Sequence, residues 1–176
     1  MPGDDLLSAA RVTDILVMAY GPFIQKPLAE TSVADWQNMA LTCLALPGIL
    51  ASAAAMSMAS RGFGRILLFG GTRTDCIRGF RTNAAYAAAK TGIGVVAKSI
   101  SAEFGARGVS SAVVCPGYID TEYVPPAIGS ALAKASPRGK MIPVSDIAGL
   151  VLYLMEGGMD LANGSVIVAD TGLQAI

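Results

Sequence analysis

The chain has 176 residues, a length that suits one domain. Its 13 basic and 13 acidic residues give a formal charge of zero and include no basic block, which argues against a nucleic-acid partner. Hydrophobic residues make up 53% of the chain and charged residues 15%, so we expect surface that is buried against other subunits or against a missing part.

The cysteines and the N-terminal sequence predict a cytoplasmic protein. Cys43, Cys76 and Cys115 are widely spaced and odd in number, and they form no metal-ligand pattern. No metal site is therefore predicted, and a reducing cytosol is the simplest setting. The first residues, Met-Pro-Gly-Asp-Asp, lack the basic-then-apolar layout of a signal peptide.

The first part of the chain predicts a strand between two helices. The end of a helix, a short apolar strand and a loop are expected at residues 6–11, 14–19 and 22–30. A long helix should then begin near Thr31, with Ser32 as its N-cap and Asp35 three residues on. We expect it to run to about Ser60, with a bend near Pro47.

Part of this helix resembles a membrane span in composition. Residues 39–59 are uncharged and about long enough to cross a bilayer. They are also rich in Ala, Ser and Met, and small residues suit close helix packing in water as well as in lipid. We therefore predict no membrane span, but a largely buried helix that partly faces another subunit.

The rest of the chain continues the alternation of strands and helices. Strands are expected at 65–69, 110–114 and 165–168, an irregular polar stretch at 70–81, and a mobile lid at 118–141. An alanine-rich helix should run from Asn83 to Phe104, and Ser145 should cap a further helix that ends at Met155. This alternation predicts a single α/β domain with a parallel sheet and helices on both faces.

Tyr86 and Lys90 are the strongest candidates for chemistry. A spacing of four places the phenol and the ammonium group on one helix face, one turn apart. A phenol has a pKa of ~10 in water, and a neighbouring cation lowers that pKa. Because the chain has no His, a tuned phenol is a plausible general acid or base for a carbonyl or alcohol oxygen.

The order of motifs around this pair is informative. An apolar strand ending in Gly70-Gly71, the Tyr-x-x-x-Lys helix, a second strand and Pro116-Gly-x-Ile-x-Thr121 follow one another. This order resembles the second half of a short-chain dehydrogenase/reductase, closest to the bacterial 3-oxoacyl-carrier-protein reductase-like branch. Asp14-Ile-Leu-Val17 and the segment 163–172 add to the resemblance, which spans about residues 6–172.

The resemblance implies the C-terminal half of a doubly wound Rossmann-like sheet, the family's strands 4 to 7. It implies an NAD(P)-dependent oxidoreductase in which Tyr86 gives a proton to a carbonyl oxygen and Lys90 lowers the phenol's pKa. Thr72 is the nearest hydroxyl to Gly71, which stands where the family has a catalytic Ser. The residues implied to bind the cofactor are Gly21, Tyr86, Lys90, Pro116, Gly117, Ile119 and Thr121.

Several departures keep a second interpretation open. No Gly-x-x-x-Gly-x-Gly loop follows an apolar strand, and Cys43 stands where the family has an Asn that anchors a relay water. The chain is therefore either an active oxidoreductase acting on a small carbonyl or alcohol, or a non-catalytic relative that serves as a binding or oligomerisation module. Arg73, Arg78 and Arg81 either meet an anionic substrate or form a solvated loop.

The resemblance also predicts assembly. In the family, the two long helices pack across a two-fold axis, so we expect a homodimer or homotetramer. The strand at 14–19 would lie at an open sheet edge, because the family's neighbouring strand is absent from this sequence. We expect that edge to be covered by another copy, by a companion polypeptide, or by the N-terminal residues.

Overall fold

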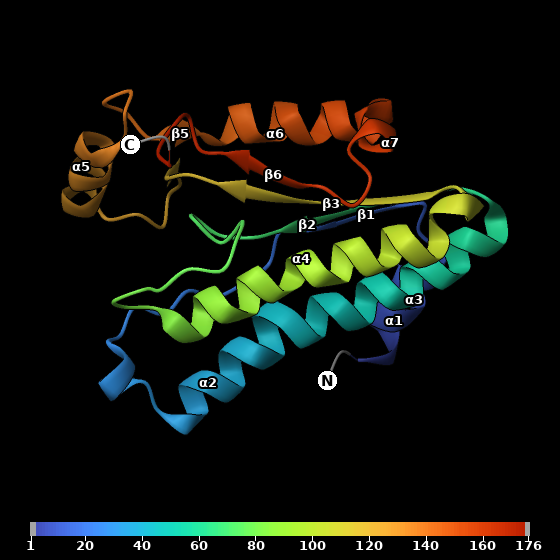
Figure 1. Ribbon diagram of the computed structural model, residues 1–176, viewed down its shortest axis with the longest axis horizontal. Coiled ribbons are helices and arrows are strands. Elements are labelled where there is room, and N and C mark those ends of the chain that lie inside the picture. Colours follow the sequence, from blue (N-terminus) through green and yellow to red (C-terminus); the bar gives the residue numbers. More distant parts are fainter. Residues whose placement is uncertain (1–2, 175–176) are drawn as a thin grey trace.

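The fold is built around a four-stranded parallel sheet. The computed structural model describes residues 3–174, and the strand order is β1-β2-β3-β6 (Figure 1). The strands are β1 (Ile15–Met18), β2 (Gly64–Phe69), β3 (Val109–Pro116) and β6 (Val166–Ala169), and all three pairings are parallel. The predicted α/β class with a parallel sheet is confirmed.

Helices cover both faces of the sheet. One layer contains α1 (Asp4–Val12), α2 (Val33–Ala40), α3 (Leu46–Arg61) and α4 (Ala84–Phe104), as Figure 1 shows. The opposite layer contains α6 (Val144–Tyr153) and α7 (Met159–Leu161), joined by a π-helical segment, Leu154–Gly158. Short 3-10 turns lie at Leu28–Glu30 and Gly105–Arg107.

Alternating side chains of the central strands fill two separate cores. Ile66 and Leu68 of β2 are fully buried against α3 and α4, whereas Leu67 is fully buried against Leu154 and Met159 of the other layer. Successive side chains of a strand point to opposite faces, and parallel sheets are normally covered on both. Burial of both faces explains the near-continuous apolar sequences of β2 and β3.

The long helix predicted to begin near Thr31 starts as expected. Ser32 is the N-cap of α2, and Ser32 and Asp35 form a reciprocal capping box. The bend expected near Pro47 takes the form of a π-helical turn at Leu41–Ala45, directly before α3. Proline has no N–H and its ring clashes with the preceding turn, so a widened turn at this point is consistent with its position.

This helical segment also has the length and composition of a membrane span. Residues Val33–Arg61 are long and apolar enough to cross a membrane, and 44% of the most apolar window is buried inside the structure. A helix in the core of a protein can be equally long and apolar without crossing a membrane. Here the segment packs on α1, α4 and β2.

Two expectations for the last third of the chain need correction. Ser145 does not cap α6: the N-cap is Pro143, which pairs with β4, and Ser145 lies inside the first turn without a capping bond. The stretch at 118–141, expected to be a mobile lid, contains α5 (Pro126–Ala135) and the short strand β4 (Ile119–Asp120), which pairs with β5 (Ile142–Pro143) just beyond it. Pro125 and Pro126 mark the start of α5, because proline is favoured at the first helical positions.

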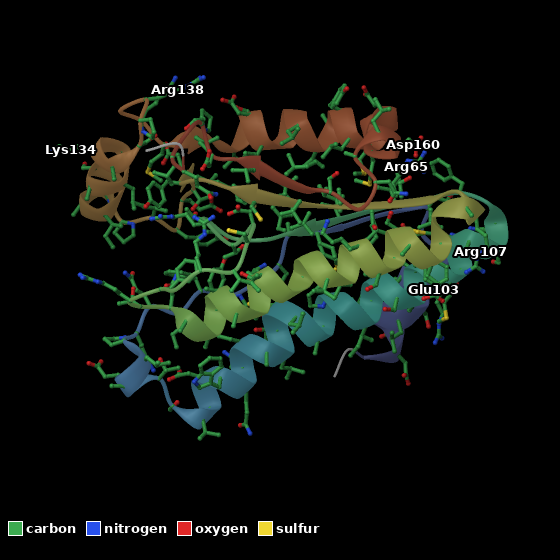
Figure 2. The ribbon with its side chains drawn as sticks, in the orientation of Figure 1. Arg65, Glu103, Arg107, Lys134, Arg138 and Asp160 are labelled. Atoms are coloured by element: carbon green, nitrogen blue, oxygen red, sulfur yellow. The ribbon has the colours of Figure 1, made fainter. Side chains whose placement is uncertain are left out.

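A charge cluster closes the amino-terminal end of the sheet. Arg65 of β2 binds Asp160 of α7 at 2.8 Å, and Ser110 of β3 donates to the same carboxylate at 2.7 Å. Figure 2 shows Arg65 and Asp160 side by side at the end remote from α5. The carboxyl ends of the strands lie at the opposite end of the sheet, toward α5, and the candidate site lies there (Figure 1).

The junction before β3 generates a stability prediction. Gly108 has a φ of 79°, and an added Cβ would collide with the carbonyl oxygen of Gly62. Gly62 has a similar φ of 76°, but an added Cβ there would meet nothing within 4 Å. Gly108→Ala should lower the free energy of unfolding by more than ~1 kcal/mol, and by more than Gly62→Ala does, as measured by urea denaturation. Equal losses in the two variants would contradict a steric role for Gly108.

Candidate active site

Tyr86 and Lys90 both project from the first half of α4. Asn83 precedes the helix with a left-handed φ of 68°, a conformation that Asn tolerates better than most residues. The Lys90 Nζ lies 6.0 Å from the centroid of the Tyr86 ring. The prediction that the two side chains share one helix face is therefore confirmed.

Lys90 is held at the end of the neighbouring strand. Its side chain is buried, and its Nζ donates to the carbonyl oxygen of Phe69, the last residue of β2, at 2.9 Å. Gly21, in the loop after β1, approaches the same group: an added Cβ would lie 2.8 Å from the Lys90 Nζ and 3.5 Å from the Cys43 Sγ. The structure thus brings Gly21 and Lys90 together.

Tyr86 lies in a largely apolar setting. The ring of Phe23 meets it edge-on, with centroids 5.0 Å apart. An added Cβ on Gly71 would lie 2.8 Å from the phenol oxygen, so the hydroxyl rests directly over the glycine backbone. A glycine at position 71 permits this close approach.

The pKa of Tyr86 differs from the expectation that Lys90 lowers it. Burial raises the pKa of Tyr86 to about 12, and the nearby thiols of Cys43 and Cys115 shift the pKa in the same direction. Burial also lowers the pKa of Lys90. Burial disfavours the charged form of each group, and the ammonium bonds a carbonyl rather than the phenol. In this state the phenol is the neutral acid.

Thr72, the candidate hydroxyl, and the nearby Thr74 make different hydrogen bonds. The Thr72 Oγ1 donates to the Gly117 carbonyl oxygen at 3.3 Å and so joins the loop after β2 to the loop after β3. The buried Thr74 Oγ1 accepts from the Gly71 N–H at 2.7 Å and donates to the Gly71 carbonyl oxygen at 3.0 Å. Thr74 therefore fixes the backbone on which the Tyr86 hydroxyl rests.

The loop after β3 lies beside this arrangement. The Gly117 N–H donates to the Ala169 carbonyl oxygen at 3.1 Å, and an added Cβ on Gly117 would lie 2.9 Å from the Asp170 Cα. Pro116 is the last residue of β3, Ile119 belongs to β4, and Thr121 is half-buried just beyond it. The structure places these residues at the same sheet end as Lys90, and Gly117 is linked to the candidate site through Thr72.

Cys43 and Arg78 bond to groups other than Tyr86 and Lys90. Cys43 is fully buried with Met39, Ala85 and Ala89, as expected of a small core residue, and its Sγ donates to the Pro22 carbonyl oxygen at 3.4 Å. Arg78 is paired with Asp75 at 3.2 Å, so it is not free to meet an anionic substrate in this state. Among the described residues, no three His, Cys, Asp or Glu side chains are grouped to hold a metal.

Sequence reasoning missed Phe23 and Cys115 as neighbours of Tyr86. Cys115 directly precedes Pro116-Gly117 at the carboxyl end of β3, so its position in the sequence is a usable signal. Phe23 lies in a loop without periodicity, and nothing in the sequence pattern points to its contact with Tyr86.

Comparison with known proteins identifies the family. A family model described as Enoyl-(Acyl carrier protein) reductase matches residues 4–174. The chain belongs to the short-chain dehydrogenase/reductase family. It is 31% identical over 169 residues to YtkK of Bacillus subtilis (strain 168), covering 93% of this chain and 66% of the relative. It is 35% identical over 123 residues to the 3-oxoacyl-[acyl-carrier-protein] reductase MabA of Mycobacterium avium, covering 68% of this chain and 48% of the relative.

Solved structures of the family have the same fold. A short chain dehydrogenase/reductase family protein superposes with a TM-score of 0.85 at 30% identity, covering 98% of this chain and 72% of that chain. A gluconate 5-dehydrogenase from Burkholderia cenocepacia J2315, in complex with NADP and tartrate, superposes with a TM-score of 0.86 at 27% identity, covering 97% of this chain and 71% of that chain. The chain thus spans about two thirds or less of its curated relatives and about 70% of these structures.

The residues present fit one end of NAD(P). The absence of a Cβ on Gly21 lets its loop lie against the Lys90 ammonium, and an ammonium can donate to ribose hydroxyls. Gly117 and Thr121 lie on the neighbouring loop. The sequence holds no glycine-rich loop between a strand and a helix to cradle the pyrophosphate. The fit is therefore to the nicotinamide-ribose end.

The burial of Tyr86 predicts an unusual titration. Its folded-state pKa of about 12 exceeds the ~10 of an exposed phenol, so its neutral form stabilises the fold fully below pH ~10. That stability should be lost as the pH rises from ~10 through about 12. The phenolate absorbance of the wild type minus that of Tyr86→Phe, recorded while circular dichroism reports an intact fold, should show a step near pH 12. A step at or below pH ~10 in the folded chain would refute the burial argument.

Proposed function

We propose that this chain carries the acid–base side of an NAD(P)-dependent oxidoreductase site that reduces a carbonyl or oxidises a secondary alcohol. The single observation that carries the proposal is the placement of Tyr86 and Lys90 on one face of α4, at the carboxyl end of β2. The oxidoreductases among its relatives, including the 3-oxoacyl-carrier-protein reductase MabA, support the same chemistry.

The proposed chemistry divides the work between two residues. When bound, the nicotinamide supplies the hydride for the carbonyl carbon or accepts it from the alcohol carbon. Tyr86 gives its phenolic proton to the carbonyl oxygen during reduction and takes it back during oxidation. Lys90 holds the ribose, and its positive charge stabilises the phenolate that remains.

The neutral phenol suits the reducing direction. A phenol is protonated at neutral pH both at the ordinary pKa of ~10 and at the pKa of about 12 that Tyr86 has here, so the residue begins as an acid, which is the form that carbonyl reduction needs. A carbonyl oxygen gains negative charge as the hydride arrives, and that charge draws the proton from the phenol. The 3-oxoacyl thioester class named for MabA is accordingly the first substrate class to test.

A second function is favoured by specific residues. Gly71 supplies no hydroxyl beneath the Tyr86 oxygen, and Thr72 is bonded to Gly117. Cys43 is buried as a core residue and donates only weakly. These features fit a family relative that binds partners without hydride transfer. A measurement of cofactor binding distinguishes this function from the oxidoreductase.

We also propose a homodimer formed through α3 and α4. A groove of about 320 Å³ runs between these helices, and its lining includes the exposed side chains of Met56 and Val95. The small residues Ser52 and Ser99 also line the groove and leave room for side chains of a second helix pair. An exposed apolar patch of this kind is typical of an interface between subunits.

The cofactor prediction separates binding from chemistry. Isothermal titration should detect NADPH or NADH at micromolar affinity, and Lys90→Ala should weaken that affinity at least ~10-fold because a charged donor is lost. Tyr86→Phe should keep the affinity and reduce turnover of an acetoacetyl thioester at least ~100-fold. Tyr153→Phe, on the exposed surface of α6, is the control and should change neither. No binding at millimolar cofactor would eliminate the enzyme and leave the non-catalytic function.

The dimer prediction uses two exposed apolar residues on different helices. Val95→Glu, on α4, should convert the dimer to a monomer in light scattering, because a carboxylate at the interface would be desolvated without a partner. Leu152→Glu, on α6, is similarly exposed and should leave the dimer intact. A wild-type chain that is monomeric at all concentrations would contradict the proposed interface.

A further inference from the structure

The hydrogen-bond donors around the Tyr86 phenol are committed to other groups. The Lys90 Nζ lies 6.0 Å from the centroid of the phenol ring, but it donates to the Phe69 carbonyl oxygen at 2.9 Å. The Cys43 Sγ donates to the Pro22 carbonyl oxygen at 3.4 Å. Both donors therefore serve backbone oxygens rather than the phenol.

Gly71 gives the phenol its resting place. An added Cβ on this residue would lie 2.8 Å from the phenol oxygen, 2.9 Å from Cε1 and 3.2 Å from Cζ of Tyr86. A side chain at position 71 would therefore push the ring away from the end of β2. Phe23 is the neighbour able to yield, because it meets the ring edge-on and its own side chain is 60% exposed.

The backbone of Gly71 offers a phenolate no free donor. The Gly71 N–H donates to the Thr74 Oγ1 at 2.7 Å. The Gly71 carbonyl oxygen accepts from the Thr74 Oγ1 at 3.0 Å and from the Thr74 N–H at 3.2 Å. Thr74 is buried, so these bonds are shielded from water. Hydrogen bonds to the charged form favour that form, and here the N–H beneath the phenol is already occupied.

We propose that Gly71 and Thr74 are positioning residues that keep Tyr86 a proton donor. Gly71 makes room for the phenol against the end of β2, and Thr74 occupies the N–H that would otherwise stabilise a phenolate there. The inference rests on the proposed function for its catalytic meaning, because carbonyl reduction needs a proton donor. Its test follows the phenol itself and requires neither cofactor nor hydride transfer.

Three titratable side chains face the phenol from the described elements that pack around it. They are Lys90 on α4, Cys43 on the π-helical turn and Cys115 near the end of β3. Burial is the largest cause of the raised pKa of Tyr86, and the two thiols raise that pKa further. All three side chains are retained in the variants below, so a changed titration reports on Gly71 and Thr74.

Three threonine variants test the role of Thr74. Thr74→Val frees the Gly71 N–H to donate to a phenolate, so the phenolate absorbance step should fall from about pH 12 by at least ~1 pH unit. Thr74→Ser keeps the hydroxyl and should titrate as the wild type does. Thr72→Val, in the same loop, frees only an acceptor, the Gly117 carbonyl oxygen, and should leave the step in place.

A pair of glycine variants tests the resting place. Gly71→Ala should displace the phenol and move the step from about pH 12 toward the ~10 of an exposed phenol. Gly94→Ala, on the same helix as Tyr86, adds a Cβ that lies 3.4 Å from the Val166 side chain and should leave the step in place. Each titration is the absorbance of a variant minus that of the same variant carrying Tyr86→Phe, recorded while circular dichroism reports an intact fold.

Two sets of results would overturn the proposal. In the first, folded Thr74→Val titrates as the wild type does, or Thr74→Ser or Thr72→Val shifts as far as Thr74→Val, because a freed donor would then not be the cause. In the second, folded Gly71→Ala keeps its step near pH 12. If Gly71→Ala does not fold, the threonine variants decide alone. A failure to bind cofactor, by contrast, refutes the proposed oxidoreductase and leaves these titrations unaffected.

Discussion

The buried ammonium of Lys90 is the interaction on which the candidate site depends. A buried charge is tolerated only when a polar partner replaces water, and here that partner is the carbonyl oxygen of Phe69. Phe69 is the last residue of β2, so the position of the charge is set by where the strand ends. Gly21 must then lack a side chain, because a Cβ would occupy the space of the Nζ. One lysine thereby ties α4, β2 and the loop after β1 together.

Close contacts at two glycines also position the Tyr86 phenol. An added Cβ on Gly70 would collide with the Cys115 Sγ, and one on Gly71 would press on the Tyr86 hydroxyl. Thr74 holds both backbone groups of Gly71. The apolar surroundings that result raise the pKa of Tyr86 and lower that of Lys90. The same burial therefore favours the neutral form of both groups. An acid prepared in this way needs a substrate or cofactor charge to release its proton.

Much of the fold follows from patterns that the sequence displays. The apolar strands, the Ser32–Asp35 capping box and the Tyr86–Lys90 spacing each depend on neighbours in the chain, and each was predicted correctly. The error at Ser145 arose because Pro143 starts α6 through its pairing with β4, a contact between distant segments. The pKa of Tyr86 was expected to fall because spacing shows that a cation is near. Spacing does not show that Phe23, Gly71 and Cys115 bury the ring.

The β1 edge of the sheet lies one strand away from β2, whose end holds Lys90. The helix that carries Tyr86 and Lys90 packs chiefly on β2, β3, α2 and α3, none of which needs a partner beyond β1 to be buried. β1 reaches the site in two ways: it pairs with β2, whose last residue holds the Lys90 ammonium, and the segment after β1 places Gly21 at the ammonium and Phe23 at the phenol ring. A change at β1 would therefore act on the acid–base pair through the β2 backbone as well as through these two loop contacts. Because Gly21 and Phe23 come from one short loop, a shift of that loop would move the surroundings of the ammonium and of the phenol together.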